Sequence, residues 1–297
     1  MKNLKYLLGP MRLPFLVLPP ACVLLGIAVA VHDAGRVSLV HSLLALIGGV
    51  SAHISVNAFN EYFDFRSGLD AKTQRTPFSG GSGTLQARPD LAPQTLGVAL
   101  ATLAITGLIG AYFLAIWGLG LLPLGLLGLL VIVIYTPWLA LSPILCLIAP
   151  GLGFGTMMVM GTSYVLTGRY SWVAFAASLV PFFLVSNLLL LNQFPDVDAD
   201  QSIGRRHLPI VAGRKTSSWV YAGFLLGAYL TIGIAVTLGL FPALTLLAWI
   251  LVPLAVFVAV GAVRFADDLE KLVPYLGLNV ILNLATPVLV AIGLFLG

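Results

Sequence analysis

The chain has 297 residues, of which 59% are hydrophobic and only 9% are charged, and its formal net charge is +4. A soluble domain usually carries roughly 25% charged residues, so this composition excludes a water-covered globule and indicates a protein solvated by lipid. We expect membrane lipid around it and no nucleic-acid partner. Cys22 and Cys146 lie within apolar runs and indicate neither a disulfide framework nor a zinc site.

The chain begins with a basic segment up to Arg12, and the apolar run that follows continues past Val23. We interpret this run as a first transmembrane helix and not as a removed signal peptide. A spanning helix needs about 20 mostly apolar residues. Nine segments meet this requirement: 13–31, 38–58, 94–116, 119–136, 144–166, 173–192, 216–238, 241–263 and 273–296. The sequence therefore predicts an all-α, polytopic membrane protein with one membrane-embedded domain over 1–297 and long polar loops at about 61–92 and 193–215.

The basic residues fall mostly on one side of this nine-helix arrangement. Of the 15 lysines and arginines, all but Arg36 and Arg169 lie on the side that holds the N-terminus and both long loops. Basic loops stay in the cytoplasm, so we expect a multi-pass protein of the cell membrane whose long loops face the cytoplasm. All acidic residues except Asp33 lie on that same side, which the positive-inside rule does not explain.

Two motifs repeat at matching positions. Asn60-Glu61-Tyr62-Phe63-Asp64 ends the second expected helix, and Asn192-Gln193-Phe194-Pro195-Asp196 ends the sixth. Both have the pattern Asn-x-x-x-Asp, and both precede a long polar loop. The repeat suggests two related four-helix units with the first helix added, and such paired motifs indicate a site between the repeats.

Each motif places polar side chains on one helix face. Asn60 and Asp64 are four residues apart and share a face, and Gly68 is a suitable helix stop that would let Asp70 turn back toward them. In the second motif we expect Asn192, Asp196 and Asp200 on one side of two helical turns, with Asp198 pointing elsewhere.

Carboxylates gathered at two adjacent helix ends repel one another, and Mg²⁺ resolves this because it prefers carboxylate and phosphate oxygens. We therefore predict that Mg²⁺, bound to a diphosphate, is held by four metal ligands: Asp64, Asp70, Asp196 and Asp200. The loops supply cations for the remaining phosphate oxygens: Lys72, Arg75, Arg205 and Arg206. A diphosphate neutralised in this way leaves more readily, and the carbon that it leaves becomes cation-like.

These motifs resemble those of the UbiA superfamily of membrane prenyltransferases, and most closely its 1,4-dihydroxy-2-naphthoate polyprenyltransferase branch. The resemblance rests on the two acidic motifs, on Gly204-Arg205-Arg206-His207-Leu208 after the second, and on Arg12, Pro14 and Tyr135. Glu61, Arg205, His207 and the loop 75–83 depart from the usual pattern. The resemblance implies a catalytic set of Asn60, Asp64, Asp196 and Tyr135, and a substrate-binding set of Arg12, Asn57, Lys72, Arg75, Asn192, Arg205 and Arg206.

The function expected from this resemblance is Mg²⁺-dependent transfer of a prenyl chain from an isoprenoid diphosphate to an aromatic quinone precursor. A glycerolipid or tetrapyrrole acceptor, an anion transporter and a non-catalytic binding scaffold are the alternatives. The acidic motifs at helix ends disfavour a transporter, because transport sites lie near the bilayer midplane. Asn57 is open to two readings, acceptor contact or a hydrogen bond between helices, and for His53 we favour the hydrogen bond.

Overall fold

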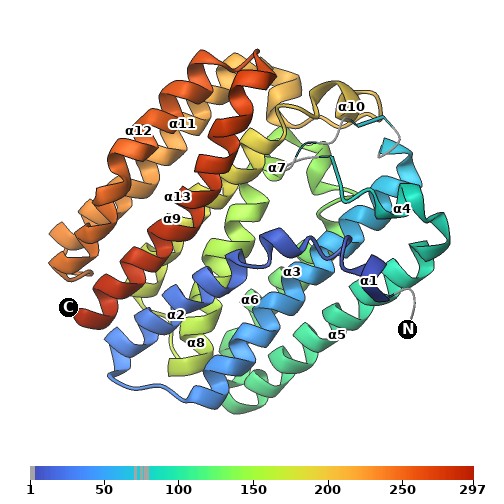
Figure 1. Cartoon of the computed structure of the whole chain (residues 1–297). Coiled ribbons are helices and arrows are strands. Elements are labelled where there is room, and N and C mark those ends of the chain that lie inside the picture. Colours follow the sequence, from blue (N-terminus) through green and yellow to red (C-terminus); the bar gives the residue numbers. More distant parts are fainter. Residues whose placement is uncertain (1–3, 70–71, 74–75, 77–79) are drawn as a thin grey trace.

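The computed structural model describes residues 4–69, 72–73, 76 and 80–297, and within these ranges it contains helices and no strand (Figure 1). The first half comprises α1 (Leu4–Leu7), η1 (Leu13–Phe15), α2 (Leu18–Ala34), α3 (Leu39–Ser67), α4 (Thr84–Ala87), η3 (Pro89–Leu91), α5 (Ala92–Trp117), η4 (Gly118–Leu121) and α6 (Leu122–Ile134). The second half comprises η5 (Leu139–Leu141), α7 (Pro143–Gly151), the π-helix η6 (Leu152–Met160), α8 (Gly161–Thr167), α9 (Trp172–Asn192), α10 (Val197–Gln201), α11 (Leu208–Thr237), η7 (Ala243–Leu251), α12 (Val252–Arg264) and α13 (Leu269–Leu296).

The described residues hold eight helical segments that are long and apolar enough to cross a membrane, and one of them, Pro89–Ile134, is 46 residues long. A straight helix of that length would extend for about 69 Å, roughly twice the hydrocarbon core. Gly118 breaks it with a φ of 76°, and the helices on either side, α5 and α6, both pack against α3. The nine expected segments therefore each correspond to helix, and the prediction of an all-α multi-span protein is confirmed.

Helix α3 extends beyond the apolar span 38–58 to Ser67, because Phe59, Tyr62 and Phe63 extend its apolar character. The first motif therefore lies in its last turns, and the helix stop expected at Gly68 is confirmed. Gly68 ends the helix in the left-handed conformation, with a φ of 76°, and donates its N–H to the carbonyl oxygen of Asp64, as expected of a helix C-cap.

The second motif does not lie on one continuous helix. Helix α9 ends at Asn192, a turn follows, and the short α10 begins at Val197. Pro195 has no N–H to donate to a preceding carbonyl oxygen, which favours a break at this point. The expected loop 193–215 is also shorter than predicted, because α11 begins at Leu208 and bends at Gly213, whose φ is 82°.

Helices in the middle of the bundle approach closely through small residues. A Cβ on Gly151 would lie 2.2 Å from the carbonyl oxygen of Phe182, and one on Gly155 would lie 2.4 Å from that of Ser178. This Gly-x-x-x-Gly pair brings α7 and η6 directly against α9, as small residues commonly do between membrane helices. Single π-helical turns often occur at functional sites, and η6 lines the cavity described below.

The bundle has two sides joined by its central helices. Helices α11, α12 and α13 form one side and α3 and α5 the other, with α2 and α9 between them (Figure 1). Large apolar side chains remain exposed on the outside, among them Leu119, Trp172 and Ile250. A patch of this kind needs a covering apolar phase, so the exposed surface agrees with a multi-pass membrane protein.

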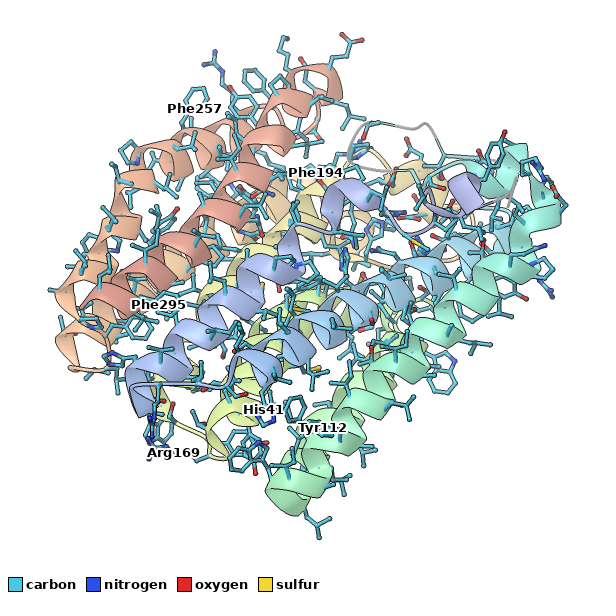
Figure 2. All side chains as sticks on the ribbon, turned by 60° about the horizontal axis from the view of Figure 1, so that its bottom comes forward. His41, Tyr112, Arg169, Phe194, Phe257 and Phe295 are labelled. Atoms are coloured by element: carbon cyan, nitrogen blue, oxygen red, sulfur yellow. The ribbon has the colours of Figure 1, made fainter. Side chains whose placement is uncertain are left out.

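Arg169 lies at the end of the bundle remote from Phe194 (Figure 2). The guanidinium of Arg169 donates to the carbonyl oxygen of Asp33 at 2.9 Å. This bond joins the last turn of α2 to the connection after α8, so these two chain segments lie at the same end of the bundle.

Candidate active site

A cavity of about 590 Å³ opens between the helices, within the size range of small-molecule sites. Its walls come from the segment around Arg12 and from α3, α5, α6, η6 and α9. Most of the lining is apolar. Nine of the residues predicted from the sequence also line it: Arg12, Asn57, Asn60, Asp64, Tyr135, Asn192, Asp196, Asp200 and Arg205. The two acidic motifs, 132 residues apart in the chain, therefore meet at one cavity.

The first motif is fixed by a chain of hydrogen bonds along α3. The Asn60 amide donates to Oδ2 of Asp64 at 3.0 Å and to the Thr136 hydroxyl at 3.3 Å. Arg12 donates to the Asn60 carbonyl oxygen at 3.4 Å. These bonds orient Asp64 toward the cavity and bring the N-terminal segment to its rim.

Arg12 has an unusual backbone conformation. Its φ is 50° and its ψ is 58°, and among the described residues it is the only non-glycine residue with a positive φ. Such a conformation is disfavoured for a side chain with a Cβ and occurs often at functional sites. The strain places the guanidinium at the cavity wall, where its Nε is buried without a hydrogen-bond partner.

The second motif is held by side chains that follow it in the sequence. Arg205 donates to Oδ1 of Asp200 at 2.9 Å, and Nε2 of His207 lies 2.8 Å from Oδ2 of the same carboxylate. The backbone N–H of Asp200 donates to the carbonyl oxygen of Asp196 at 2.9 Å. Both oxygens of Asp200 are thus oriented by bonds, and the turn of α10 sets its distance from Asp196.

Arg205 connects the two motifs, because its guanidinium also forms an ion pair with Asp64. Burial by itself lowers the pKa of Arg205, but the carboxylates of Asp64 and Asp200 outweigh it and raise the pKa above its ordinary value. The arginine therefore stays charged in its buried position. A guanidinium that contacts both motifs is well placed to receive an anion that lies between them.

The donor set of the cavity fits Mg²⁺. Among the described residues, no group of three His, Cys, Asp or Glu forms a complete metal site. Asp64, Asp196 and Asp200 nevertheless line one space, and the buried Oδ1 of Asn192 has no hydrogen-bond partner. Mg²⁺ in proteins commonly takes one or two carboxylates and completes its coordination shell with water and substrate phosphates. The carboxylates at this cavity can supply the protein part of such a shell.

Two of the predicted residues that the structure describes are not brought to the cavity. The side chains of Lys72 and Arg206 are exposed and do not line it. Asp70 and Arg75 lie outside the described residues, so their roles remain predictions. Asp198 is exposed and lies away from the cavity, as expected from the sequence.

Two residues with a place in the site were not assigned one from the sequence. Glu61 is 1% exposed and accepts hydrogen bonds from the backbone N–H of Ser82 at 3.0 Å and from the Ser82 hydroxyl. It thereby attaches the segment containing Gly80 and Gly81, which lines the cavity, to α3. His207 orients Asp200. Both residues stand where the sequence departs from the pattern of the resembled family, and that departure was the available signal.

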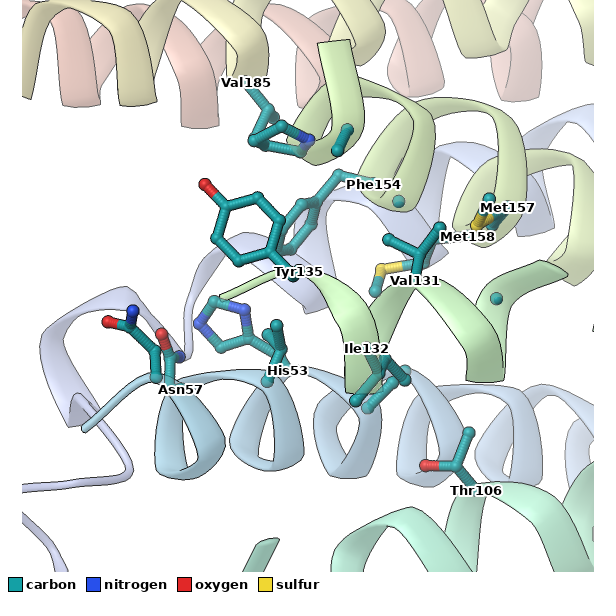
Figure 3. A pocket seen from close by; sticks show the side chains of 18 of the residues that line it. His53, Asn57, Thr106, Val131, Ile132, Tyr135, Phe154, Met157, Met158 and Val185 are labelled. Carbon is teal, nitrogen blue, oxygen red and sulfur yellow. The ribbon is translucent and has the colours of Figure 1, made fainter. Parts of the chain in front are cut away.

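On the far wall, Tyr135 at the end of α6 borders the cavity beside a buried cysteine. Its hydroxyl lies 3.9 Å from the sulfur of Cys146, which also accepts a hydrogen bond from the Gln193 amide at 3.1 Å. These contacts hold the Tyr135 side chain at the wall opposite α3 (Figure 3). Cys146 is a buried free thiol, as expected.

Three comparisons place this architecture among known proteins. The 1,4-dihydroxy-2-naphthoate octaprenyltransferase of Bacillus subtilis (strain 168) is 30% identical over 220 residues, which cover 72% of this chain and 68% of that protein. A UbiA homolog from Aeropyrum pernix K1 has a TM-score of 0.66 at 18% identity, over 94% of this chain and 96% of that chain. A UbiA homolog from Archaeoglobus fulgidus, solved bound to DMAPP and Mg²⁺, has a TM-score of 0.58 at 13% identity, over 94% of this chain and 99% of that chain.

At these identities the two structures establish a shared fold. The sequence model of the UbiA prenyltransferase family matches residues 17–285, nearly the whole chain. With both acidic motifs at one cavity inside an all-helical membrane bundle, the chain belongs to the UbiA prenyltransferase family and is a membrane-embedded prenyltransferase.

Proposed function

We propose that this prenyltransferase moves a prenyl chain from a Mg²⁺-bound isoprenoid diphosphate to an aromatic quinone precursor and releases diphosphate. The observation that carries the proposal is one cavity with two chemically different parts. Both acidic motifs and the guanidinium of Arg205 lie at one end, and most of the remaining lining is apolar. A prenyl diphosphate matches this cavity, because it has a charged diphosphate at one end and an apolar hydrocarbon tail at the other.

The residues at the polar end would hold the metal and the diphosphate. Asp64, Asp196 and Asp200 would be the metal ligands, and Arg12 and Arg205 would bind the phosphate oxygens. Mg²⁺, when bound, neutralises the charge that develops on the departing diphosphate. The Archaeoglobus fulgidus homolog solved bound to DMAPP and Mg²⁺ supports the binding of Mg²⁺ together with a prenyl diphosphate in a protein of this fold.

The transfer itself exchanges two bonds. The bond from the allylic carbon to the diphosphate oxygen breaks, and its electron pair leaves with the diphosphate. A ring carbon of the acceptor forms the new bond and then loses its proton, or a carboxyl group as CO₂. The ring of Tyr135 borders the cavity and can stabilise positive charge on the allylic carbon through its π face, while the apolar walls keep water away from that carbon.

The named Bacillus relative supports an aromatic acceptor, and a cavity of about 590 Å³ accommodates a bicyclic ring beside a prenyl chain. A purified sample with Mg²⁺ and geranylgeranyl diphosphate should therefore convert 1,4-dihydroxy-2-naphthoate or 4-hydroxybenzoate to a prenylated product seen by mass spectrometry. Product only from a glycerophosphate or a tetrapyrrole would overturn the aromatic assignment. Diphosphate-independent uptake of an anion into proteoliposomes would instead favour a transporter.

We further propose that the polar end of the cavity faces the cytoplasm, because the basic residues gather on that side. The two native cysteines are buried, so introduced cysteines report without background. Ser202→Cys and Arg36→Cys lie at exposed positions on opposite sides of the predicted topology. A membrane-impermeant thiol reagent should label Arg36→Cys in intact cells and Ser202→Cys only after the cells are opened. The reverse pattern would overturn the orientation.

A further inference from the structure

Helix α3 carries a polar stripe that continues below the first motif into the apolar part of the cavity. His53, Asn57, Asn60 and Asp64 are spaced by four, three and four residues and all line the cavity. This spacing puts them on one helix face. Asn60 and Asp64 bond each other and belong to the diphosphate end. The lower pair, His53 and Asn57, has no such explanation.

His53 is buried but makes no hydrogen bond within the described residues. The residue is 7% exposed, and neither Nδ1 nor Nε2 has a partner. The expectation of a hydrogen bond from His53 to another helix is therefore wrong. The ring of Phe154 lies against His53, edge to face at a centroid distance of 5.1 Å. A buried imidazole with two unsatisfied nitrogens is rare and costly, so a partner from outside the chain is indicated.

Asn57 repeats this observation one helical turn closer to the diphosphate end. Its Nδ2 is buried and has no hydrogen-bond partner. The side chains of His53, Asn57, Tyr135 and Phe154 surround a common space (Figure 3). Two unsatisfied polar groups and two aromatic rings on one cavity wall match a flat, hydroxylated aromatic molecule better than a hydrocarbon chain, which offers no hydrogen bonds.

The depth of the pair fits an acceptor that reacts at the diphosphate end. Along α3, Asn57 lies about 4.5 Å and His53 about 10.5 Å below Asn60, at about 1.5 Å per residue. Reacting atoms must approach to about 3–3.5 Å, so the attacked ring carbon lies next to the allylic carbon near Asn60. The acceptor ring then extends along α3 from Asn60 toward Asn57 and His53.

We propose that His53 and Asn57 form the polar side of the acceptor subsite, where they hydrogen-bond the ring hydroxyl groups of the acceptor. This inference rests on the proposed aromatic acceptor. A neutral imidazole has one donor and one acceptor and can pair with a phenolic hydroxyl in either direction. Phe154 and Tyr135 contact the ring faces or edges. The subsite selects hydroxylated aromatic acceptors over unsubstituted ones.

The test compares His53→Phe and Asn57→Leu with the wild type in steady-state kinetics. Loss of a hydrogen bond that leaves a substrate hydroxyl unpaired should raise the KM for 1,4-dihydroxy-2-naphthoate about 5- to 100-fold. The KM for geranylgeranyl diphosphate should change less than about twofold, since His53 and Asn57 lie below the diphosphate end. His53→Gln keeps a donor and an acceptor and should restore most of the acceptor affinity. His41→Phe is the matched control, because His41 lies on α3 outside the cavity and bonds Tyr112.

A cycle with analogues tests direct contact. 1-Hydroxy-2-naphthoate and 4-hydroxy-2-naphthoate each lack one hydroxyl, and their inhibition constants can be measured in wild type and in His53→Phe. One of the two analogues should bind the wild type much more weakly than 1,4-dihydroxy-2-naphthoate does, because it lacks the hydroxyl that His53 contacts. In His53→Phe the same analogue and the dihydroxy compound should bind equally well. Equal losses in both proteins would overturn the contact.

The inference and the proposed function fail in different ways. A wild-type enzyme that prenylates no aromatic acceptor contradicts the proposed function and the acceptor subsite with it. A wild type that prenylates the naphthoate, with an unchanged acceptor KM in His53→Phe, contradicts the subsite alone. An equal rise in donor and acceptor KM in that variant, with a lower unfolding temperature, would mean that His53 is structural and would also overturn the proposal.

Discussion

The two acidic motifs line the same cavity, but they are held there in different ways. Asn60 and Asp64 lie on the uninterrupted helix α3, which ends four residues later at Gly68. Asp196 and Asp200 follow the break after α9, and Arg205 and His207 hold Asp200 from the far side of α10. The first motif is a rigid wall, whereas the second owes its position to side-chain bonds. Substitutions around the second motif should therefore displace ligands as well as remove them.

The largest effect is expected when a metal ligand of either motif is neutralised. Asp64→Asn and Asp196→Asn should each lower kcat by about a thousandfold or more, because the departing diphosphate loses its bound counter-charge. Transfer of radiolabelled prenyl chain at saturating Mg²⁺ measures this. Asp198→Asn is the matched control, since Asp198 is exposed and outside the cavity. Near-normal turnover in either variant would remove that motif from the metal site.

The arginine between the motifs should matter next. Arg205→Ala removes a charge-assisted phosphate contact of about 1.5–3 kcal/mol, so the Kd for a prenyl diphosphate should rise about ten- to hundredfold. Arg206→Ala changes the neighbouring exposed arginine and should have little effect. Equal effects in the two variants would mean that both act through the general positive charge of the loop.

The variant His207→Phe tests whether side-chain bonds hold the second motif in position. This change removes the bond that orients Oδ2 of Asp200. Loss of a residue that orients a metal ligand typically costs ten- to hundredfold in metal affinity, so the Mg²⁺ concentration for half-maximal activity should rise by about tenfold. An unchanged Mg²⁺ requirement would show that α10 alone fixes Asp200.

The smallest effect concerns the attachment of the cavity rim to α3. Glu61→Ala should free the segment at Ser82, which borders the site through Gly80 and Gly81, and should weaken donor binding about three- to tenfold as one charged hydrogen bond is lost. Limited proteolysis should cut near Ser82 faster in Glu61→Ala than in Glu61→Gln, which keeps an acceptor. Identical cleavage in wild type and Glu61→Ala would argue against the attachment.

Hydropathy and residue spacing were enough to predict the parts of the fold that depend on local sequence. The spanning segments follow from apolar length, and the helix stop at Gly68 follows from the tolerance of glycine for positive φ. The meeting of the two motifs at one cavity was predicted because both precede a long loop on the same side. The pseudo-repeat of four-helix units itself remains a prediction.

Features that arise from packing could not be predicted in the same way. Nothing in the adjacent pair Arg205-Arg206 shows which guanidinium turns inward, because the path after α10 decides it. The π-helix η6 and its Gly151–Gly155 contact with α9 depend on a partner helix distant in sequence. His53 was assigned to a hydrogen bond between helices because polar residues inside membrane helices usually make such a bond. Only the three-dimensional structure shows that neither ring nitrogen of His53 has a hydrogen-bond partner.

The central claim is that the first motif, with Asp64, and the second motif, with Asp196 and Asp200, together form one Mg²⁺–diphosphate site. Isothermal titration of a non-hydrolysable geranylgeranyl thiodiphosphate into wild type, Asp64→Asn and Asp196→Asn, each with Mg²⁺ and with EDTA, tests it most directly. We predict that Mg²⁺ tightens binding strongly in the wild type and that either substitution alone removes most of this gain. Full Mg²⁺-dependent binding in one of the two variants would contradict a shared site.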